Sequence, residues 1–156
     1  MTVEELELVL PNGFHDARLV RLTLDYLDRT ATLHMQLFVG TPESEDPEEY
    51  KAVIVRLTGL CFFSIDLPDP NEQFAPDGSP VSVSGYSEDS TGLLKPNESI
   101  VAINTLMKNC PPGASSYRFY SHDWNSFIHI GCTDANLEWN PAGGNSSMSP
   151  GRVAAP

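Results

Sequence analysis

Strict alternation of apolar and polar residues in two neighbouring segments most constrains how this chain can fold. Every second residue is apolar in residues 20–26 (VRLTLDY), and residues 31–37 (ATLHMQL) repeat the pattern. The side chains of a β-strand point alternately to opposite faces, so this period is typical of a strand with one buried face. Only the short polar segment 27–30 separates the two. We therefore predict an antiparallel hairpin whose apolar faces, including Val20 and Tyr26, are buried.

Further strand patterns follow along the chain. Residues 51–58 are apolar on both faces in their middle, as in a strand with neighbours on both sides. Gly59 interrupts this pattern before residues 60–65 continue it, which predicts a bulge or a bend. Additional strands are expected at residues 81–83, 117–120, 127–132 and 135–139. The segment 98–109 fits a short helix after an Asn97 cap, although its β-branched residues keep a strand as the alternative.

These patterns predict a mainly β (α+β) fold class. The expected architecture is an antiparallel sheet, sandwich or half-barrel of about six to eight strands with one short helix. The 156 residues suffice for a single β-rich domain, which we place at residues 1–140. Within it, residues 66–98 form a long Pro-rich loop region, and residues 141–156 have the composition of a C-terminal tail. Five aromatic residues in strand patterns are expected in the core: Phe62, Phe63, Phe119, Phe127 and Trp139.

The acidic balance of the chain limits its partners. Lys and Arg number 9 against 21 Asp and Glu, which gives a formal net charge of -12. Such a surface repels phosphate backbones and anionic membranes, so we expect no nucleic acid and no membrane as partner. It attracts basic proteins instead. The alternative is that the charge only keeps the protein in solution.

Cysteine usage predicts a cytoplasmic protein. Cys61, Cys110 and Cys132 are odd in number and form no C-x-x-C pair, unlike a secreted disulfide framework. Residues 1–10 contain three glutamates and no basic residue, which is unlike a secretory signal.

Two His-Asp pairs are the candidates for chemistry: His15-Asp16 and His122-Asp123. An imidazole beside a carboxylate can bind a divalent metal or act as a general base. Adjacent residues of an extended chain point to opposite sides, so neither pair is expected to chelate alone. We favour structural roles, in which the aspartates cap turns. The alternative, a small metal-dependent enzyme or ligand-binding domain, requires the two pairs to meet in space.

The standard catalytic and nucleotide-binding motifs are absent from the sequence. It contains no phosphate-binding G-x-x-x-x-G-K, no G-x-G-x-x-G, no H-E-x-x-H and no G-x-S-x-G. We therefore expect no cofactor and no bound metal, and we favour a protein that is not an enzyme.

Two groups of residues are candidates for a binding surface. Residues 40–50 contain five acids and two prolines, which is typical of an exposed loop. Trp124 lies in a predicted turn beside Tyr120, where it either anchors a partner or folds back on the sheet. The candidate binding residues are Glu45, Asp46, Glu48, Glu49, Tyr120 and Trp124.

The segment 11–17 (PNGFHDA), followed by a hairpin that ends in 33–37 (LHMQL), resembles a family of bacterial β-rich proteins that begin with F-H-D-A. Residues 56–60 (RLTGL) and 135–139 (ANLEW) resemble later elements of that family. Some of its members resemble the immunity proteins of polymorphic toxin systems. The resemblance implies a cytoplasmic protein that neutralises a basic toxin by direct binding, without catalysis.

Overall fold

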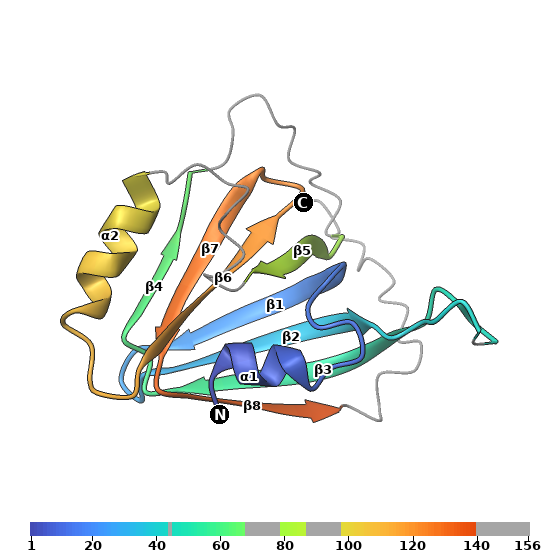
Figure 1. Ribbon diagram of the computed structural model, residues 1–156, viewed down its shortest axis with the longest axis horizontal. Helices are drawn as coiled ribbons and strands as arrows, with labels where there is room; N and C mark the ends of the chain where they lie inside the picture. Colours follow the sequence, from blue (N-terminus) through green and yellow to red (C-terminus); the bar gives the residue numbers. More distant parts are fainter. Residues whose placement is uncertain (44, 68–78, 87–97, 140–156) are drawn as a thin grey trace, which may run out of the picture.

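The computed structural model describes residues 1–43, 45–67, 79–86 and 98–139. Within these ranges the chain forms one eight-stranded antiparallel sheet and two short helices, so the predicted β-rich α+β fold is confirmed (Figure 1). The strand order is β4-β7-β6-β5-β1-β2-β3-β8. The elements are α1 (Val3–Leu8), β1 (Ala17–Asp25), β2 (Thr30–Phe38), β3 (Tyr50–Thr58), β4 (Phe62–Ile65), β5 (Val81–Tyr86), α2 (Glu98–Met107), β6 (Ser115–Ser121), β7 (Ser126–Cys132) and β8 (Asp134–Trp139).

Two sharp bends fold this sheet on itself. β3 continues into β4 through Gly59, whose φ of +59° disfavours any residue with a side chain. β7 continues into β8 through Thr133, whose backbone N–H and hydroxyl donate to the Thr58 carbonyl at 3.1 and 3.2 Å. β3 pairs with β8 at one end of the strand order, and β4 pairs with β7 at the other. The bends therefore join the two ends at one corner, from which the strands fan apart as a half-barrel (Figure 1).

The interior of the half-barrel is filled by α1 and the segment that follows it. Val3 and Leu6 of the helix are buried. Phe14 is completely buried, and its ring lies 5.3 Å from the ring of Phe119 in β6. α1 contacts both β6 and β8, which lie far apart in the strand order. The helix thus closes the core between the two arms of the sheet, whereas the sequence analysis expected only the later helix.

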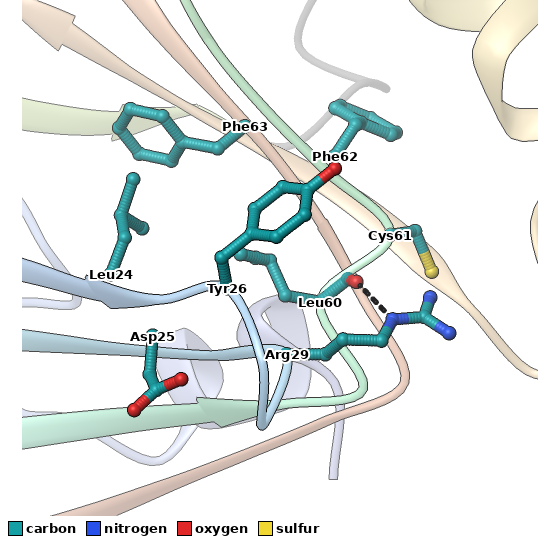
Figure 2. A pocket seen from close by; sticks show the side chains of 8 residues that line it. All are labelled: Leu24, Asp25, Tyr26, Arg29, Leu60, Cys61, Phe62 and Phe63. Carbon is teal, nitrogen blue, oxygen red and sulfur yellow. Dashed lines mark hydrogen bonds between the residues drawn. The ribbon is translucent and has the colours of Figure 1, made fainter.

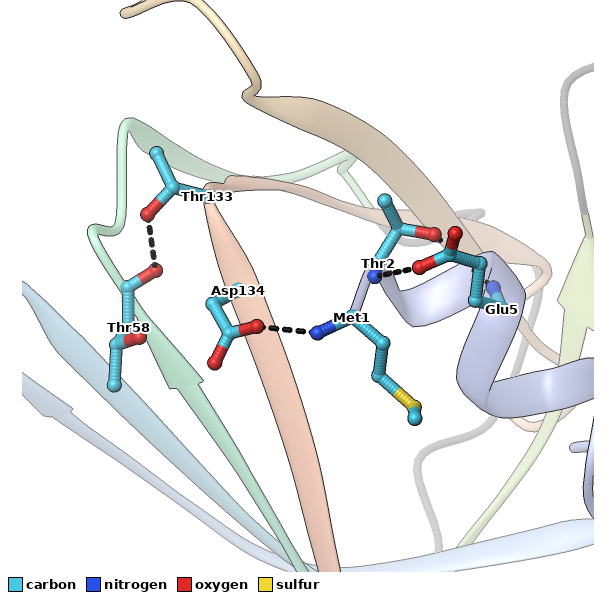
Figure 3. A network of polar contacts seen from close by, with 6 residues as sticks. All are labelled: Met1, Thr2, Glu5, Thr58, Thr133 and Asp134. Atoms are coloured by element: carbon cyan, nitrogen blue, oxygen red, sulfur yellow. Dashed lines mark hydrogen bonds and ion pairs between the residues drawn. The ribbon is translucent and has the colours of Figure 1, made fainter.

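Polar contacts hold the start of α1 against β8 (Figure 3). The Thr2 hydroxyl accepts from the Glu5 backbone N–H at 3.0 Å, and the Glu5 carboxylate accepts from the Thr2 N–H at 2.8 Å. This reciprocal capping box satisfies donors that a helix start otherwise leaves unpaired. The Met1 ammonium pairs with the Asp134 carboxylate, and the Met1 carbonyl accepts from the Ala135 N–H at 2.7 Å. Thr2 and Glu5 are therefore the sequence signal that marks this helix.

The first hairpin has the predicted pairing, but its apolar face is not fully buried. β1 pairs with β2 along its length, and Leu33 on β2 is buried as expected. On its other side β1 pairs with β5 only over residues 17–19. Val20 is 53% exposed and Leu24 is 46% exposed, while Tyr26 in the turn is 94% exposed. The prediction of a buried face is therefore wrong for the second half of β1, because a β-bulge at Val20 shifts the register with β2 and β5 pairs with β1 only before it.

The other expected elements are largely confirmed. β3 lies between β2 and β8, and the segment 98–109 contains the helix α2. Phe119 is buried and Phe62, Phe63 and Phe127 are half-buried, but Trp139 is 46% exposed on the edge strand β8, so its assignment to the core is wrong. The tail at 141–156 and most of the loop region lie outside the described residues. No helix in the described part of the chain is long and apolar enough to cross a membrane.

Candidate functional site

The acidic loop between β2 and β3 projects charge into solvent. Glu45, Asp46 and Glu48 are exposed, and Glu49 is half-buried. One Asp46 carboxylate oxygen accepts from the Glu48 backbone N–H at 3.1 Å, which stabilises a turn. The Glu49 carboxylate lies 3.3 Å from the Lys51 ammonium. The loop thus carries the predicted negative charge.

The predicted aromatic anchors are less accessible than the sequence indicated. Tyr120 and Trp124 are both half-buried. The Tyr120 hydroxyl donates to the Asn125 side-chain oxygen at 2.5 Å, and its ring packs 5.0 Å from the His122 ring and 5.2 Å from the Phe127 ring. These contacts hold Tyr120 against the sheet and leave it a small area for a partner.

The His122-Asp123 pair contacts a neighbouring strand, whereas its aspartate was expected to cap a turn. The Asp123 carboxylate accepts from the Ser82 backbone N–H at 2.6 Å, and the His122 Nε2 lies 2.9 Å from the Ser84 hydroxyl. Both side chains therefore bind β5, of which Ser82 and Ser84 are part.

The His15-Asp16 pair differs from the expectation that adjacent side chains diverge. The His15 Nδ1 lies 2.9 Å from an Asp16 carboxylate oxygen, with both side chains more than half exposed. Asp16 has a φ of +52°, so the chain is not extended here and the two side chains turn toward each other. Ala17 pairs with Val83, which places this pair beside β5 as well.

The two pairs do not create a metal centre. Across the described ranges, which include all four residues, no three His, Cys, Asp or Glu side chains are grouped closely enough to hold an ion. Transition-metal sites in proteins usually use three or four such ligands.

A pocket that the sequence did not predict lies at the tip of the first hairpin. The pocket has a volume of about 450 Å³ and opens between the end of β1 and the start of β4 (Figure 2). Figure 2 shows Leu24 and Phe63 facing each other across it, with Tyr26 beside them. Its lining residues are Leu24, Asp25, Tyr26, Arg29, Leu60, Cys61, Phe62 and Phe63. The lining is thus largely apolar and includes one acid, Asp25, and one base, Arg29.

Hydrogen bonds make the hairpin tip a defined structure. One Asp25 carboxylate oxygen accepts from the backbone N–H groups of Leu27 and Asp28, each at 3.0 Å. The Arg29 Nε donates to the Leu60 carbonyl at 3.0 Å, and the Leu60 N–H donates to the Arg29 carbonyl at 2.8 Å. The tip is therefore fixed both internally and to the bend between β3 and β4.

Large apolar side chains are exposed on this tip. Tyr26 and Leu27 are each 94% exposed. We call the group formed by Leu24, Tyr26, Leu27, Phe62 and Phe63 the hairpin-tip surface. The apolar residue at position 27, inside a turn where polar residues are usual, is the sequence signal for it.

Burial raises the pKa values of two of the three cysteine thiols, Cys110 and Cys132. Burial raises the pKa of Cys132 to about 11. Burial and the neighbouring Cys61 thiol raise the pKa of Cys110 above its ordinary value, while Arg29 opposes the shift. Because the thiolate is the nucleophilic form, Cys110 and Cys132 are poor nucleophiles at neutral pH. No disulfide joins the three cysteines, all of which are free.

Comparisons with known proteins assign no activity. No family model matches the chain, and no curated protein matches it significantly. The chain is similar to the crystal structure of an uncharacterized protein from Neisseria gonorrhoeae, at 13% sequence identity and a TM-score of 0.41. The match covers 80% of this chain and 91% of that chain.

Proposed function

We propose that this chain is a non-enzymatic, cytoplasmic protein-binding domain of the immunity type, which neutralises a basic toxin by holding it against the hairpin-tip surface. The observation that carries the proposal is the exposure of Tyr26 and Leu27, each 94%, beside a pocket lined by Leu24 and Phe63. Exposed apolar side chains gathered at a concave surface mark protein interfaces, whereas single exposed ones do not.

The rigidity of the tip supports this role. Its turn is fixed by the Asp25 carboxylate, and its base is fixed by two hydrogen bonds between Arg29 and Leu60. A partner that binds a preorganised surface loses less conformational freedom than one that must order a loop. Aromatic anchors such as Tyr26 add contact area at a small entropic cost.

Charge complementarity supports a basic partner. The net charge of -12 attracts cationic proteins over a distance of about one Debye length, roughly 8 Å at physiological salt. Asp25 and Asp28 place acidic groups at the tip itself, and the acidic loop at residues 45–49 adds a second negative region. Charge thus steers the encounter, and the apolar tip provides the contact that persists.

The test measures the affinity of the chain for a basic toxin domain by isothermal titration calorimetry. The variant Leu27→Asp removes an apolar anchor and adds one negative charge. The matched control is Leu8→Asp, since Leu8 in α1 is 78% exposed and does not line the pocket. We expect Leu27→Asp to weaken binding by about 30-fold, as for a hot-spot residue, and Leu8→Asp to change it by less than about 2-fold.

Three outcomes contradict the proposal. The first is that the toxin domain does not bind at low salt. The second is that Leu27→Asp and Leu8→Asp weaken binding equally. The third is that Leu27→Asp binds normally while charge reversal at Glu45 and Glu48 abolishes binding. The third result would show that the toxin binds the acidic loop and not the hairpin-tip surface.

A further inference from the structure

Two basic side chains, Arg118 and His129, lie on the face of the sheet opposite the half-barrel interior. Tyr117 and Phe119 of β6 are buried in the core, so Arg118 between them points to the other face. Arg118 pairs in register with His129 of β7, which shares that face, and Ser64 of β4 follows next to His129. Arg118 is 5% exposed and His129 is 3% exposed. Two groups that carry or can accept positive charge are therefore buried side by side.

The Arg118 guanidinium is buried, and two of its three nitrogens lack a hydrogen-bond partner within the described ranges. Its Nε and Nη2 atoms have no hydrogen-bond partner within the part of the chain that the structure describes. An arginine side chain stays charged at any pH that a folded protein experiences. A buried charge that lacks both a counter-ion and hydrogen bonds is strongly destabilising, so native proteins provide it with a partner.

The neighbouring groups do not neutralise Arg118. The nearby acid, Asp66, has a carboxylate oxygen 3.3 Å from the His129 Nε2, so its charge is directed to the histidine. Arg118 lies over the Phe127 ring at 5.2 Å from the ring centroid, which is a contact with a π-face and supplies no hydrogen-bond acceptor. Nε and Nη2 of Arg118 thus remain without a hydrogen-bond acceptor among the described residues.

We propose that Arg118 is the centre of a binding site for a small oxyanion, a carboxylate or a phosphate group, with His129 as a second donor. Nε and one terminal nitrogen form the planar fork that binds two oxygens of such a group at once. The proposal is independent of partner binding at the hairpin tip, because Arg118 and His129 are not among the residues that line that pocket.

The experiment measures the thermal midpoint of unfolding in sodium phosphate and in sodium acetate, with sodium chloride of equal ionic strength as reference. A ligand at 100 times its dissociation constant is expected to raise the midpoint by about 5 °C or more for a chain of this size. Phosphate and acetate, compared separately, identify which oxyanion the site prefers. In the same titrations, the NMR signal of the Arg118 Nε–H is expected to shift with saturation.

Arg118→Met should abolish the anion-dependent rise, and its own midpoint in chloride should equal or exceed that of the natural chain, because an unpaired buried charge is removed. Arg118→Lys keeps the positive charge but lacks the two parallel N–H donors of the guanidinium, so it should reduce the anion-dependent rise in the thermal midpoint. This variant provides the test if Arg118→Met does not fold. Arg21→Met, at an exposed arginine of β1, is the matched control and should keep the full rise. The proposal is overturned if neither oxyanion stabilises the natural chain beyond chloride, or if Arg118→Met retains the rise.

Discussion

Gly59 is the position at which one added methyl group should most clearly disturb the half-barrel. Its φ of +59° is in the left-handed region, and a Cβ built there would lie 2.1 Å from the Thr133 hydroxyl oxygen and 3.1 Å from the Thr133 Cβ. Rotation of the threonine side chain does not relieve the second contact. Gly59→Ala therefore forces apart the bend at Gly59 and the bend at Thr133, which together join the two ends of the sheet.

The expected loss of stability has two separable parts. A residue with a side chain at this φ costs about 1–2 kcal/mol, and overpacking against a fixed neighbour costs about 1–3 kcal/mol. We expect Gly59→Ala to lower the free energy of unfolding by about 3 kcal/mol. Gly113→Ala isolates the first part, because Gly113 also has a positive φ, +87°, but a Cβ there meets nothing within 4 Å. This control should cost about 1–2 kcal/mol.

Urea denaturation followed by circular dichroism measures these differences, and a double-mutant cycle with Thr133→Ala tests the contact itself. Thr133→Ala alone loses the hydroxyl contact to the Thr58 carbonyl, at a cost of about 0.5–1 kcal/mol for an exposed hydrogen bond. The double variant Gly59→Ala/Thr133→Ala should be more stable than additivity predicts, by about 1 kcal/mol or more. If Gly59→Ala costs no more than Gly113→Ala, the bend does not depend on the close approach of these two segments.

Three further predictions concern stability. Phe14→Ala should lower the free energy of unfolding by about 3–5 kcal/mol in urea denaturation, because it empties the centre of the core; a loss under about 1 kcal/mol would contradict the role of this segment as the core filler. Thr2→Ala should cost about 1 kcal/mol in the same assay through loss of the α1 cap, and no change would show that the helix start is not held there. The raised pKa of Cys132, about 11 against 9.0 in the unfolded chain, should leave stability unaffected below pH 9 and lower it as pH rises toward 11, since the unfolded chain ionises first. The thiol should account for about 2 kcal/mol of this loss, so the loss should be smaller by that amount in Cys132→Ala, and an equal loss in that variant would exclude the thiol as a cause.

The sequence predicted the strands well because their signal is local. The alternation in residues 31–37 corresponds to β2, where every second residue is buried, and the interruption at Gly59 corresponds to the bend. Burial of β1 was less predictable, because it depends on the bulge at Val20 and on β5, which pairs only with residues 17–19. α1 has six residues, too few for a clear helical period, so its capping box was the available signal.

The candidate sites depend on contacts that sequence spacing does not encode. Arg118 and His129 are neighbours because β6 and β7 pair in one particular register. Asp66 reaches His129 from 63 residues away in the chain. His15 and Asp16 touch because of a positive φ at Asp16, which no residue preference predicts strongly. Pattern analysis therefore located the elements, and the tertiary pairing determined which side chains meet.

The most direct test of the proposed binding surface is photo-crosslinking with a benzophenone amino acid introduced at Leu27, in the presence of a basic toxin domain that binds the chain. The same probe at Leu8, an exposed leucine of α1, is the control. Contact at the hairpin tip predicts an intermolecular crosslink from position 27 and none from position 8. A bound complex that crosslinks from position 8 and not from position 27 would contradict it.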